Sequence, residues 1–375
     1  MRLMPNSDDR LLTRVSFDSS TAYDFILGLS ELMRAEPHAS SVHERQRAAA
    51  QMGPAFVSEL QALFGRNFEN SPFIQSPYLD QMPHLDIGGL LGVIHQIPSP
   101  RTVPDFLEFL SALPAARLLG LLASNIDGSA PTTYWPRLIE RVAAGEQLSR
   151  PDKQLFAEYL DELPANYQEY IHTALANPTW MQQQLLSLLS SYYEQFFATE
   201  AERIGPRLRR TVRIHQALLG TLPTSEFIVH ITNGVRVPPE TNVPRIILAP
   251  SYLIAPYVYL LTLHDALVII YSALPEQEER RDDLALEAET LQRLKALTDE
   301  TRLKILRLLT REPQRTQDLA KRLDLTPPTI SHHLTQLRIA GLVQIRMTED
   351  VRQVYAVRSE VVNELFTALR AYLEM

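Results

Sequence analysis

The sequence predicts an α+β protein that is mainly helical and built from two parts. Its 375 residues exceed the roughly 100–200 residues of one domain. Helical periodicity dominates the chain until short β-branched runs appear within 226–272. A proline and mixed charges at 275–292 mark a linker. We therefore expect an amino-terminal domain, 1–283, that is helical with a small antiparallel sheet, and a carboxy-terminal domain, 285–375.

Amphipathic helices fill most of the amino-terminal domain. A short strand at Thr13–Phe17 precedes a helix at about 20–34, whose apolar face includes Tyr23, Ile26 and Leu27. Further helices are expected at 43–64, 103–111, 113–123, 133–144, 151–160, 178–204 (the longest) and, after a stop or kink at Pro206, 206–219.

Four β-rich runs follow in the same domain. EFIVHIT, PRIILAPS, APYVYLLTL and ALVIIYS are expected to be strands, with turns at Asn233-Gly234 and His264-Asp265. These runs predict the small antiparallel sheet at 226–272.

Composition restricts the class of protein. Hydrophobic residues make up 45% and charged residues 21%, which is ordinary for a folded soluble protein. The segment MRLMPNSDDR has no apolar core behind its arginine, so we expect no signal peptide. The most apolar run, 253–270, contains Pro256 and His264-Asp265, which are costly in lipid, so two buried strands fit better than a membrane span.

The absence of cysteine excludes thiolate metal sites and thiol redox sensing, and it agrees with a cytoplasmic protein. His84-x-Asp86 and His264-Asp265 are the only close His/Asp spacings, and they favour loop polarity over a metal site. We therefore expect no metal and no cofactor. The sequence also lacks a glycine-rich phosphate loop and a Gly-x-Ser-x-Gly elbow, which argues against an enzyme.

The carboxy-terminal domain shows a helix, a tight turn, a second helix and two strands. TQDLAKRL predicts the first helix, and PPTISHHLTQLR predicts the second. Thr326 caps the second helix, the prolines after it fit its first turn, and Gly341 lies just past its end. Ile330, Leu334 and Leu337 form an apolar stripe that should pack on Leu319, Leu323 and Leu303. LVQIRMTEDVRQVYAV then predicts a hairpin wing, the layout that carries a helix into the major groove of DNA.

Polar side chains occupy the opposite face of the second helix, where glutamine can pair with adenine and hydroxyls or histidine can reach base edges or phosphates. His333 lies nearer the flank, so its partner is either a phosphate or a neighbouring helix. The wing tip, Thr348-Glu349-Asp350, is acidic, so the strand residues are the better candidates there. The candidate DNA-contacting residues are Thr316, Gln317, Thr326, Thr329, Ser331, His332, His333, Thr335, Gln336, Arg338, Arg346 and Arg352.

Charge supports this prediction. Residues 302–346 hold nine Lys/Arg against three Asp/Glu, a net charge of +6 in a chain of net charge −8. A second arginine cluster at 203–213 either extends the DNA track or pairs with the acidic surface of the amino-terminal domain. A winged helix that docks proteins instead of DNA is the alternative function.

The segments LKALTDETRLKILRLL and TQDLAKRLDLTPPTISHHLTQLRIAGLVQIR resemble the ArsR-type winged helix-turn-helix regulators. The resemblance covers the last quarter of the chain and rests on Thr301–Leu306, Leu319–Ala320, Ser331–Leu334 and Ala340–Val343. It implies a dimeric transcription regulator, with Thr329, Ser331, His332, His333 and Gln336 on the reading helix and Arg352 on the wing. More faintly, RVSFDSSTAYDFILGLSEL and RIILAPSYLIAPYVYLLTLHDALVIIYS resemble the uncharacterised amino-terminal domain of large ArsR-type regulators.

Two apolar stripes predict the dimer contact: Leu284, Leu291, Leu294 and Leu297, and Val362, Phe366, Leu369 and Leu373. The alternative is that both stripes complete the monomer core. Three roles compete for the amino-terminal domain: a sensor for a small non-metal molecule, an assembly domain, and an enzyme with a DNA-binding tail. We expect a cytoplasmic homodimeric repressor that binds double-stranded DNA without a membrane partner. The sequence gives neither the operator nor the effector.

Overall fold

The structure, a computed structural model, describes residues 10–33, 42–63, 87–98, 101–122, 134–161, 165–263, 265–274, 288–350 and 352–373. Two compact units divide the chain. Unit 1 combines Met1–Val15, Arg213–Arg245 and Leu274–Met375, and unit 2 combines Ser16–Val212 and Ile246–Ala273. The segment 213–245 thus joins the carboxy-terminal residues, which differs from the expected division at 283–285.

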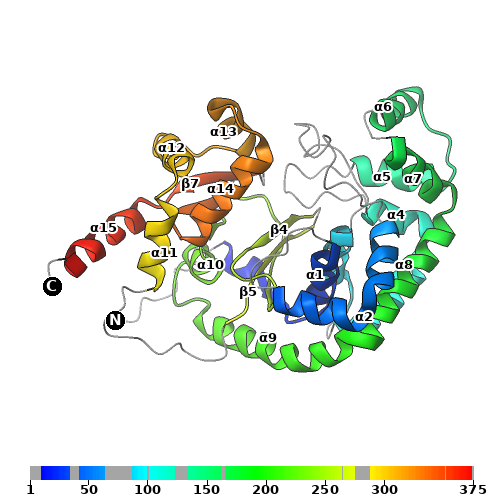
Figure 1. Cartoon of the computed structure of the whole chain (residues 1–375), viewed down its shortest axis with the longest axis horizontal. Coiled ribbons are helices and arrows are strands. Elements are labelled where there is room, and N and C mark those ends of the chain that lie inside the picture. The colour runs from blue at the N-terminus through cyan, green and yellow to red at the C-terminus, as the bar shows by residue number, and fades with distance from the viewer. Residues whose placement is uncertain are drawn as a thin grey trace. The chain divides into compact units, whose positions relative to one another are not determined.

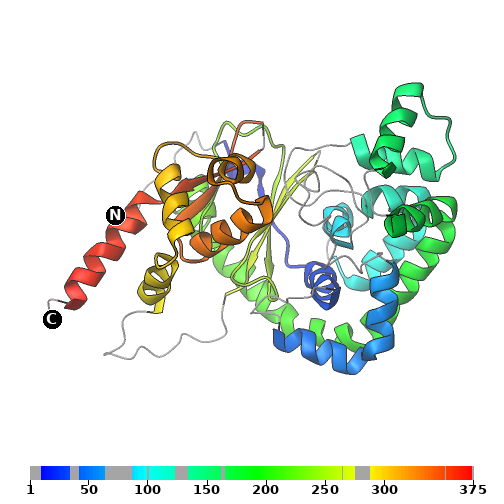
Figure 2. The ribbon, with the colours of Figure 1, turned by 45° about the horizontal axis from the view of Figure 1, so that its top comes forward.

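Helices dominate unit 2, as predicted. Thr102 begins one of them with a reciprocal cap, in which its hydroxyl accepts the Asp105 N–H and the Asp105 carboxylate accepts the Thr102 N–H. The helices and helical turns are α1 (Ala22–Met33), α2 (Val42–Leu63), η4 (Ile87–Gln96), α3 (Val103–Ala112), α4 (Ala115–Leu122), α5 (Tyr134–Ala143), α6 (Arg150–Asp161), α7 (Ala165–Ala176), α8 (Pro178–Tyr192), η5 (Tyr193–Phe197) and α9 (Ala198–Leu218), the last of which continues into unit 1. Within unit 2, α2 packs against both α1 and α8 (Figure 2).

Proline and glycine act differently in two of these helices. In α2, Gly53 has φ +78° and is followed by Pro54, so two helical segments meet at a kink. In α9, Pro206 lies inside a continuous helix. The predicted helix from 178 is instead α8, one π-helical turn (η5) and the beginning of α9.

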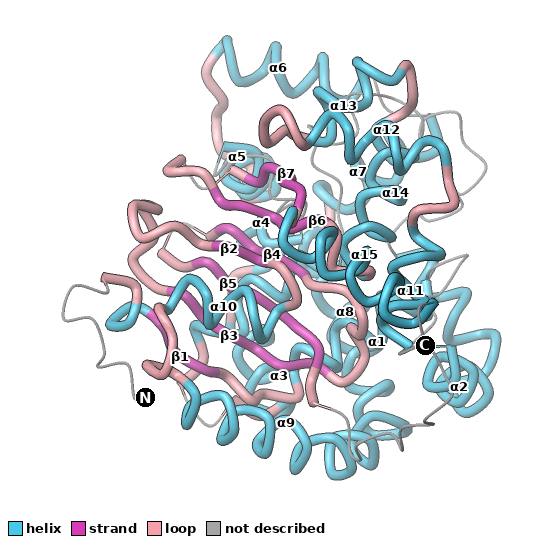
Figure 3. The backbone as a smooth tube through the Cα atoms, turned by 90° about the vertical axis from the view of Figure 1, so that its left-hand side faces the viewer, coloured by secondary structure: helices cyan, strands magenta, loops and turns pink. Residues whose placement is uncertain are grey.

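A four-stranded sheet in the order β1-β3-β5-β4 packs against these helices (Figure 3). Its strands are β1 (Val15–Phe17), β3 (Ile246–Ser251), β4 (Tyr259–Thr262) and β5 (Leu267–Ser272). The pair β4–β5 is antiparallel as predicted, but β3 and β5 run parallel. Nearly every residue of β3 and β5 is buried, which explains why both are continuous apolar runs, the pattern of parallel strands.

Asp24 of α1 fixes the chain that leaves β3. Its Oδ1 accepts hydrogen bonds from the Ser251 hydroxyl (2.7 Å), the Tyr252 N–H (2.9 Å) and the Leu253 N–H (3.0 Å). Asp24 is fully buried, and burial raises its pKa to about 6 although these three bonds act in the opposite direction. A single carboxylate therefore joins the first long helix to the sheet.

The prediction of a strand at 226–232 is wrong, because these residues form the helix α10 (Thr224–Thr232). Phe227, Ile228 and Val229 are buried, and Asn233 ends the helix in the left-handed conformation with φ +50°. Its β-branched residues favour a strand by propensity, but packing of the helix in unit 1 overrides that propensity.

The rest of unit 1 contains the predicted helices and hairpin (Figure 1), together with η1 and β2, which were not predicted. Its core is formed by the apolar residues of these elements, among them Leu319, Leu334 and Leu342. The elements are η1 (Leu12–Arg14), β2 (Val235–Arg236), α11 (Ala288–Ala296), α12 (Glu300–Leu309), α13 (Thr316–Leu323), α14 (Pro327–Ile339), β6 (Val343–Met347), β7 (Gln353–Val357) and α15 (Ser359–Leu373). Among the helices of the described residues, none is long and apolar enough to cross a membrane.

Candidate nucleic-acid interface

Helix α14 begins and ends where the sequence predicts. Thr326 Oγ1 accepts the Thr329 N–H at 3.4 Å, and Pro327 and Pro328 occupy the first turn. At the other end, Gly341 has φ +71°, and the Leu342 N–H donates to the Leu337 carbonyl at 2.9 Å. This bond closes a Schellman-type end, so the length of the helix is fixed by local chemistry.

The apolar stripe anchors α14 in unit 1. Ile330, Leu334 and Leu337 are all 0% exposed and belong to one cluster with Leu319 of α13 and Ile305 of α12. Leu303, which was expected in this contact, is 48% exposed. Ile305, Leu306 and Leu309 of α12 are buried instead, because residue 303 lies about 200° around the helix from residue 305 and so faces away from the core.

The turn between α13 and α14 is held in a tight conformation. Asp324 ends α13 with φ +56°, a left-handed conformation that aspartate tolerates. The Leu325 N–H donates to the Ala320 carbonyl at 3.1 Å. The conformation of Asp324 and this hydrogen bond together set the direction in which the chain passes from α13 to α14.

The outer face of α14 is polar and accessible. Thr329, Ser331 and His332 are exposed, and Thr335 and Gln336 are half-buried. Thr326 is exposed before the helix, and Thr316 and Gln317 are half-buried at the start of α13. The structure therefore brings most of the predicted residues to one helix and its neighbouring turn.

His333 lies beside a neighbouring helix, one of its two expected partners. Its Nδ1 is 3.7 Å from Oδ1 of Asp299, the residue that caps α12. The Arg302 N–H, 2.8 Å from Asp299 Oδ1, lowers the pKa of that carboxyl. Burial lowers the pKa of His333 itself, so the imidazole is neutral at neutral pH.

Arg338 differs from the other candidates because it is only 4% exposed. Position 338 is four residues after Leu334 and eight after Ile330, so helical periodicity turns it to the inner face. Arg346 is half-buried on β6, and Arg352 is exposed on the wing.

The lysines and arginines of residues 304–322 fall into two groups, those that form ion pairs and those that do not. Lys304 pairs with Glu300 (2.8 Å), Arg315 with Asp318 (3.2 Å), and Arg322 with Glu312 (3.1 Å). Lys321, Arg307 and Arg311 are exposed, and no ion pair joins them to any described residue. Sequence reasoning did not distinguish these three from the paired cations, because pairing depends on side-chain geometry.

The wing contains a strand that the sequence did not predict. β6 and β7 form the expected antiparallel hairpin, and β2 adds to the other edge of β6 in parallel, with Val235 opposite Ile345. The Ile345 N–H donates to the Gly234 carbonyl at 2.7 Å, and the Asn242 N–H donates to the Glu349 carbonyl at 3.3 Å. The three-stranded sheet therefore has one edge of the hairpin covered.

Side chains reinforce this added strand. Arg236 pairs with Glu226 of α10 at 2.5 Å, and its Nε donates to Gln344 Oε1 at 3.3 Å. Val235 is fully buried. The signal in the sequence was Asn233-Gly234, a turn that we assigned to a hairpin within the amino-terminal sheet.

Within the described ranges, no group of three or more His, Asp or Glu is placed to hold a metal ion. His84, Asp86 and His264, which the sequence analysis considered for such a site, lie outside the described residues.

Comparison with known proteins agrees with this geometry. Residues 299–344, which span α12 to the beginning of β6, match the family model "Bacterial regulatory protein, arsR family". Comparison with curated proteins gives no significant match. The chain therefore carries, at residues 299–344, a helix-turn-helix domain of the arsR family of bacterial regulatory proteins, which supports a DNA-binding transcription regulator.

Proposed function

We propose that this protein binds a specific sequence of duplex DNA with the outer face of α14. The supporting observation is that Thr329, Ser331 and His332 are exposed on a helix whose opposite stripe is fully buried. A helix held in this way can enter the major groove without unfolding its own core.

The candidate residues have different roles in this proposal. Ser331, His332, Thr335 and Gln336 contact base edges, with Gln336 pairing with an adenine. Thr316, Gln317, Thr326 and Thr329 hold phosphates near helix amino termini, where N–H groups and the helix dipole favour anions. Arg346 and Arg352 contact the backbone beside the wing, and buried Arg338 supports the helix from within.

We further propose a homodimer in which α11 and α15 of two copies meet. Leu291 is 43% exposed, Phe366 55% and Tyr372 48%, although Leu365 and Val361 on the same helix α15 are buried. One face of each helix therefore packs in the core of unit 1, and other apolar side chains of the same helix are exposed. A second copy of the chain would cover these exposed side chains. A symmetric dimer reads two half-sites about one helical turn of DNA apart.

The proposed regulator is a cytoplasmic repressor and not an enzyme. Occupation of promoter DNA blocks polymerase without a further contact, whereas activation requires one. Unit 2 then serves as the regulatory part and binds a small non-metal effector. The placement in the cytoplasm follows from the proposed partner, duplex DNA.

The test is selection of duplexes bound by the full-length protein from a random pool, followed by sequencing. The expected result is a motif with two related half-sites, whose affinity falls steeply with salt. Retention of no duplex at low ionic strength would contradict the proposal and favour the alternative, a winged helix that docks proteins.

A further inference from the structure

Helix α9 carries five arginines within eleven residues. The run 203–213 contains no acidic residue, although the whole chain has a net charge of −8. Its arginines are Arg203, Arg207, Arg209, Arg210 and Arg213. The sequence left two roles open for this cluster, an extension of the DNA track or pairing with the acidic surface of the amino-terminal domain. The contacts of each arginine indicate which of these roles it fits.

The inner face of α9 is buried, which fixes the direction of its arginines. Ile204 is 3% exposed, and Leu208 and Thr211 are fully buried. Successive residues of a helix are rotated by about 100°, so these three side chains share one face and the five arginines lie on the remaining arc. Four of the arginines are exposed, and Arg207 is half-buried. Together they form a basic surface about 15 Å long on the outer side of the helix, which we call the arginine face.

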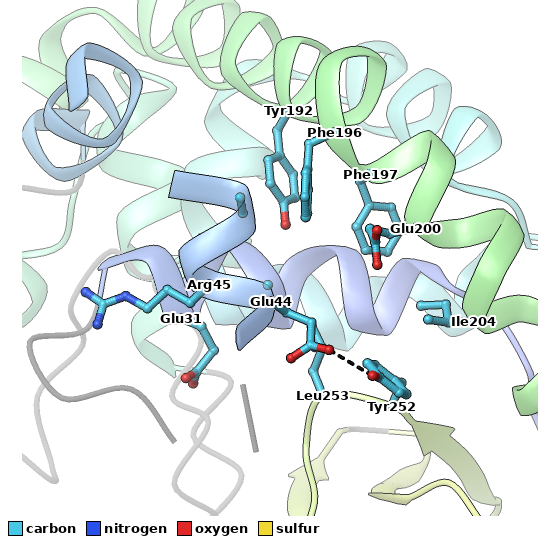
Figure 4. A pocket seen from close by; sticks show the side chains of 12 residues that line it. Glu31, Glu44, Arg45, Tyr192, Phe196, Phe197, Glu200, Ile204, Tyr252 and Leu253 are labelled. Atoms are coloured by element: carbon cyan, nitrogen blue, oxygen red, sulfur yellow. Dashed lines mark hydrogen bonds between the residues drawn. The ribbon is translucent and has the colours of Figure 1, made fainter. Parts of the chain in front are cut away.

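Arg203 and Arg207 are held by contacts within unit 2. The guanidinium carbons of both lie 4.7 Å from the centroid of the Tyr252 ring. Arg203 also pairs with Glu200 at 2.9 Å, and the Tyr252 hydroxyl donates to Glu44 Oε1 at 2.8 Å (Figure 4). This end of the arginine face therefore belongs to a network with carboxylates of the same unit, which is the second of the two roles.

Arg209 and Arg213 have no such contacts. They are exposed and lie about one helical turn apart, and no ion pair or side-chain hydrogen bond joins either of them to a residue that the structure describes. The Arg209 guanidinium lies along the helix beside Gly205, where an added Cβ would be 3.1 Å from its Nη1 atom. These two cations are therefore accessible to an anion from outside the chain.

Arginine is well suited to phosphate as a ligand. Its guanidinium is planar and always charged, and two of its N–H groups can bind one phosphate side by side. Duplex DNA carries about one negative charge per 1.7 Å of its axis, so a row of cations along a helix can meet several phosphates. The spacing of Arg209 and Arg213 along α9 therefore fits an extended polyanion better than a single small anion.

The other exposed residues of this face argue against a membrane surface as the anion. Apart from the arginines, the exposed residues between 202 and 213 are Glu202 and Pro206. A helix that lies on a lipid bilayer needs an accessible apolar face, whereas the apolar side chains Ile204 and Leu208 of α9 are buried. Duplex DNA is the polyanion that agrees with the arsR-family helix-turn-helix domain of the same chain.

We propose that the arginine face of α9 binds the phosphate backbone of duplex DNA, with Arg209 and Arg213 as its principal contacts. This inference rests on the DNA-binding regulator proposed above and adds a second contact surface to it. Phosphates are the same in every sequence, so contacts from α9 raise the affinity for all duplexes alike. Discrimination between sequences is left to the outer face of α14.

Salt titration of the full-length variant Arg209→Gln/Arg213→Gln tests this inference. Fluorescence anisotropy measures binding to the selected duplex and to a scrambled duplex of the same length. The slope of log affinity against log salt should become shallower by about 1.8 for both duplexes, because each lost phosphate contact removes about 0.9. Affinity for both should fall about tenfold or more at about 0.1 M salt. The preference for the selected duplex should change by less than about twofold.

Two further variants provide matched controls. Arg150→Gln/Lys153→Gln removes two exposed cations of α6, which form no ion pair with a described residue, and so changes the net charge by the same amount. Its salt slope should equal that of the wild type. Arg209→Lys/Arg213→Lys keeps both charges on α9 and should keep the slope within about half a unit. An equal loss of slope in the α6 and α9 glutamine variants would be an effect of net charge and would overturn the inference.

The two duplexes separate this inference from the proposed function. If the wild type bound both duplexes equally and the α9 glutamine variant lost slope, the α9 contact would stand and specific reading by α14 would be contradicted. If the wild type preferred the selected duplex and the variant kept its slope, the regulator would stand and the α9 contact would be overturned. The inference would also fail if the variant kept its slope on DNA but lost binding to phosphatidylglycerol vesicles, because the arginine face would then belong to a membrane contact.

Discussion

Gln336 on α14 is expected to read a base, so its substitution should alter specificity. Gln336→Ala removes the amide that pairs with adenine and should cost about 1–3 kcal/mol at the cognate duplex. The loss should be confined to one base position, because the rest of the polar face is unchanged. Affinities for a set of duplexes with single base changes measure this effect.

Lys321 is the matched comparison, since it is exposed on α13 and forms no ion pair with a described residue. Lys321→Ala should weaken all duplexes alike and reduce the salt slope by about one unit, as expected for a phosphate contact. If Gln336→Ala also weakened every duplex equally, its base-reading role would be wrong.

Asp24 makes the stability of unit 2 depend on pH. Its pKa of about 6 lies above the 3.8 of an unfolded aspartate. The protonated form is therefore favoured by folding, and this contribution is complete below about pH 4 and is lost as the pH rises through 6. The melting temperature of unit 2 should accordingly be higher near pH 5 than near pH 7.5, measured by calorimetry.

Asp24→Asn separates the charge from the hydrogen bonds. The amide oxygen can still accept from Ser251, Tyr252 and Leu253 but does not titrate. The variant should lose the part of the pH dependence that lies between pH 4 and 7. An unchanged pH profile would show that Asp24 does not titrate in this range.

Single residues show where sequence reasoning succeeds and where it stops. The cap at Thr326, the stripe of Ile330 and the end at Gly341 are local patterns, and all three were predicted. The inward direction of Arg338 follows from the same periodicity, but its positive charge suggested a phosphate contact instead. The neighbours of Tyr192 could not be predicted, because Glu44, Tyr192 and Tyr252 come together from segments that are far apart in the chain.

At the level of elements, β2 is the feature with the clearest consequence for stability. It begins after Gly234, whose φ of +110° is unfavourable for any residue with a Cβ. Gly234→Ala should destabilise unit 1 by more than about 1 kcal/mol. Hydrogen exchange of the Ile345 amide, which bonds to the Gly234 carbonyl, should become about fivefold to tenfold faster.

Asn233→Gly is the control for this change. Asn233 has φ +50°, which glycine adopts without strain. Exchange of the Ile345 amide should stay within about threefold of the wild type. Equal acceleration in both variants would mean that any change in this turn loosens β2.

Helices with a long hydrophobic periodicity were predicted accurately. The prediction failed where long-range packing determined whether a segment became a helix or a strand, or which strands pair. Helices α1 to α6, α13 and α14 lie within a few residues of their expected bounds. The run at 226–232 became helix α10 because its apolar residues are buried in unit 1, a contact absent from local propensity. The parallel pairing of β3 and β5 was missed because the position of a strand within a sheet is a long-range property.

For the whole molecule, the proposed dimer makes oligomeric state and DNA binding inseparable. Phe366→Ser removes the most exposed large apolar side chain of α15. The variant should sediment as a monomer and bind a two-half-site duplex at least tenfold more weakly, because one copy contacts only one half-site. Analytical ultracentrifugation and a gel shift measure the two effects.

Trp180→Ser is the control for loss of exposed apolar surface. Trp180 lies on α8 of unit 2 and is 49% exposed. This variant should keep the oligomeric state of the wild type. If Phe366→Ser remained dimeric, α15 would not form the dimer contact.

The architecture of the whole chain was only partly accessible from sequence. Composition and periodicity predicted a mainly helical α+β protein with a helix-turn-helix domain near its end. They could not indicate that 213–245 groups with that domain, since the linker at 275–292 suggested an ordinary boundary. Where the chain leaves a discontinuous unit and later returns to it, the amino-acid composition does not change, so these boundaries cannot be recognised in the sequence.

The strand β2 also limits how this protein can be rearranged by recombination or engineering. A gene fragment that starts at the linker would encode a hairpin with an uncovered edge, prone to pair with other chains. A DNA-binding fragment that keeps this edge covered would instead have to include residues 213–245 together with 288–373. Chimeras that exchange unit 2 would therefore have to be joined at all four points where the chain passes between the units, after residues 15, 212, 245 and 273.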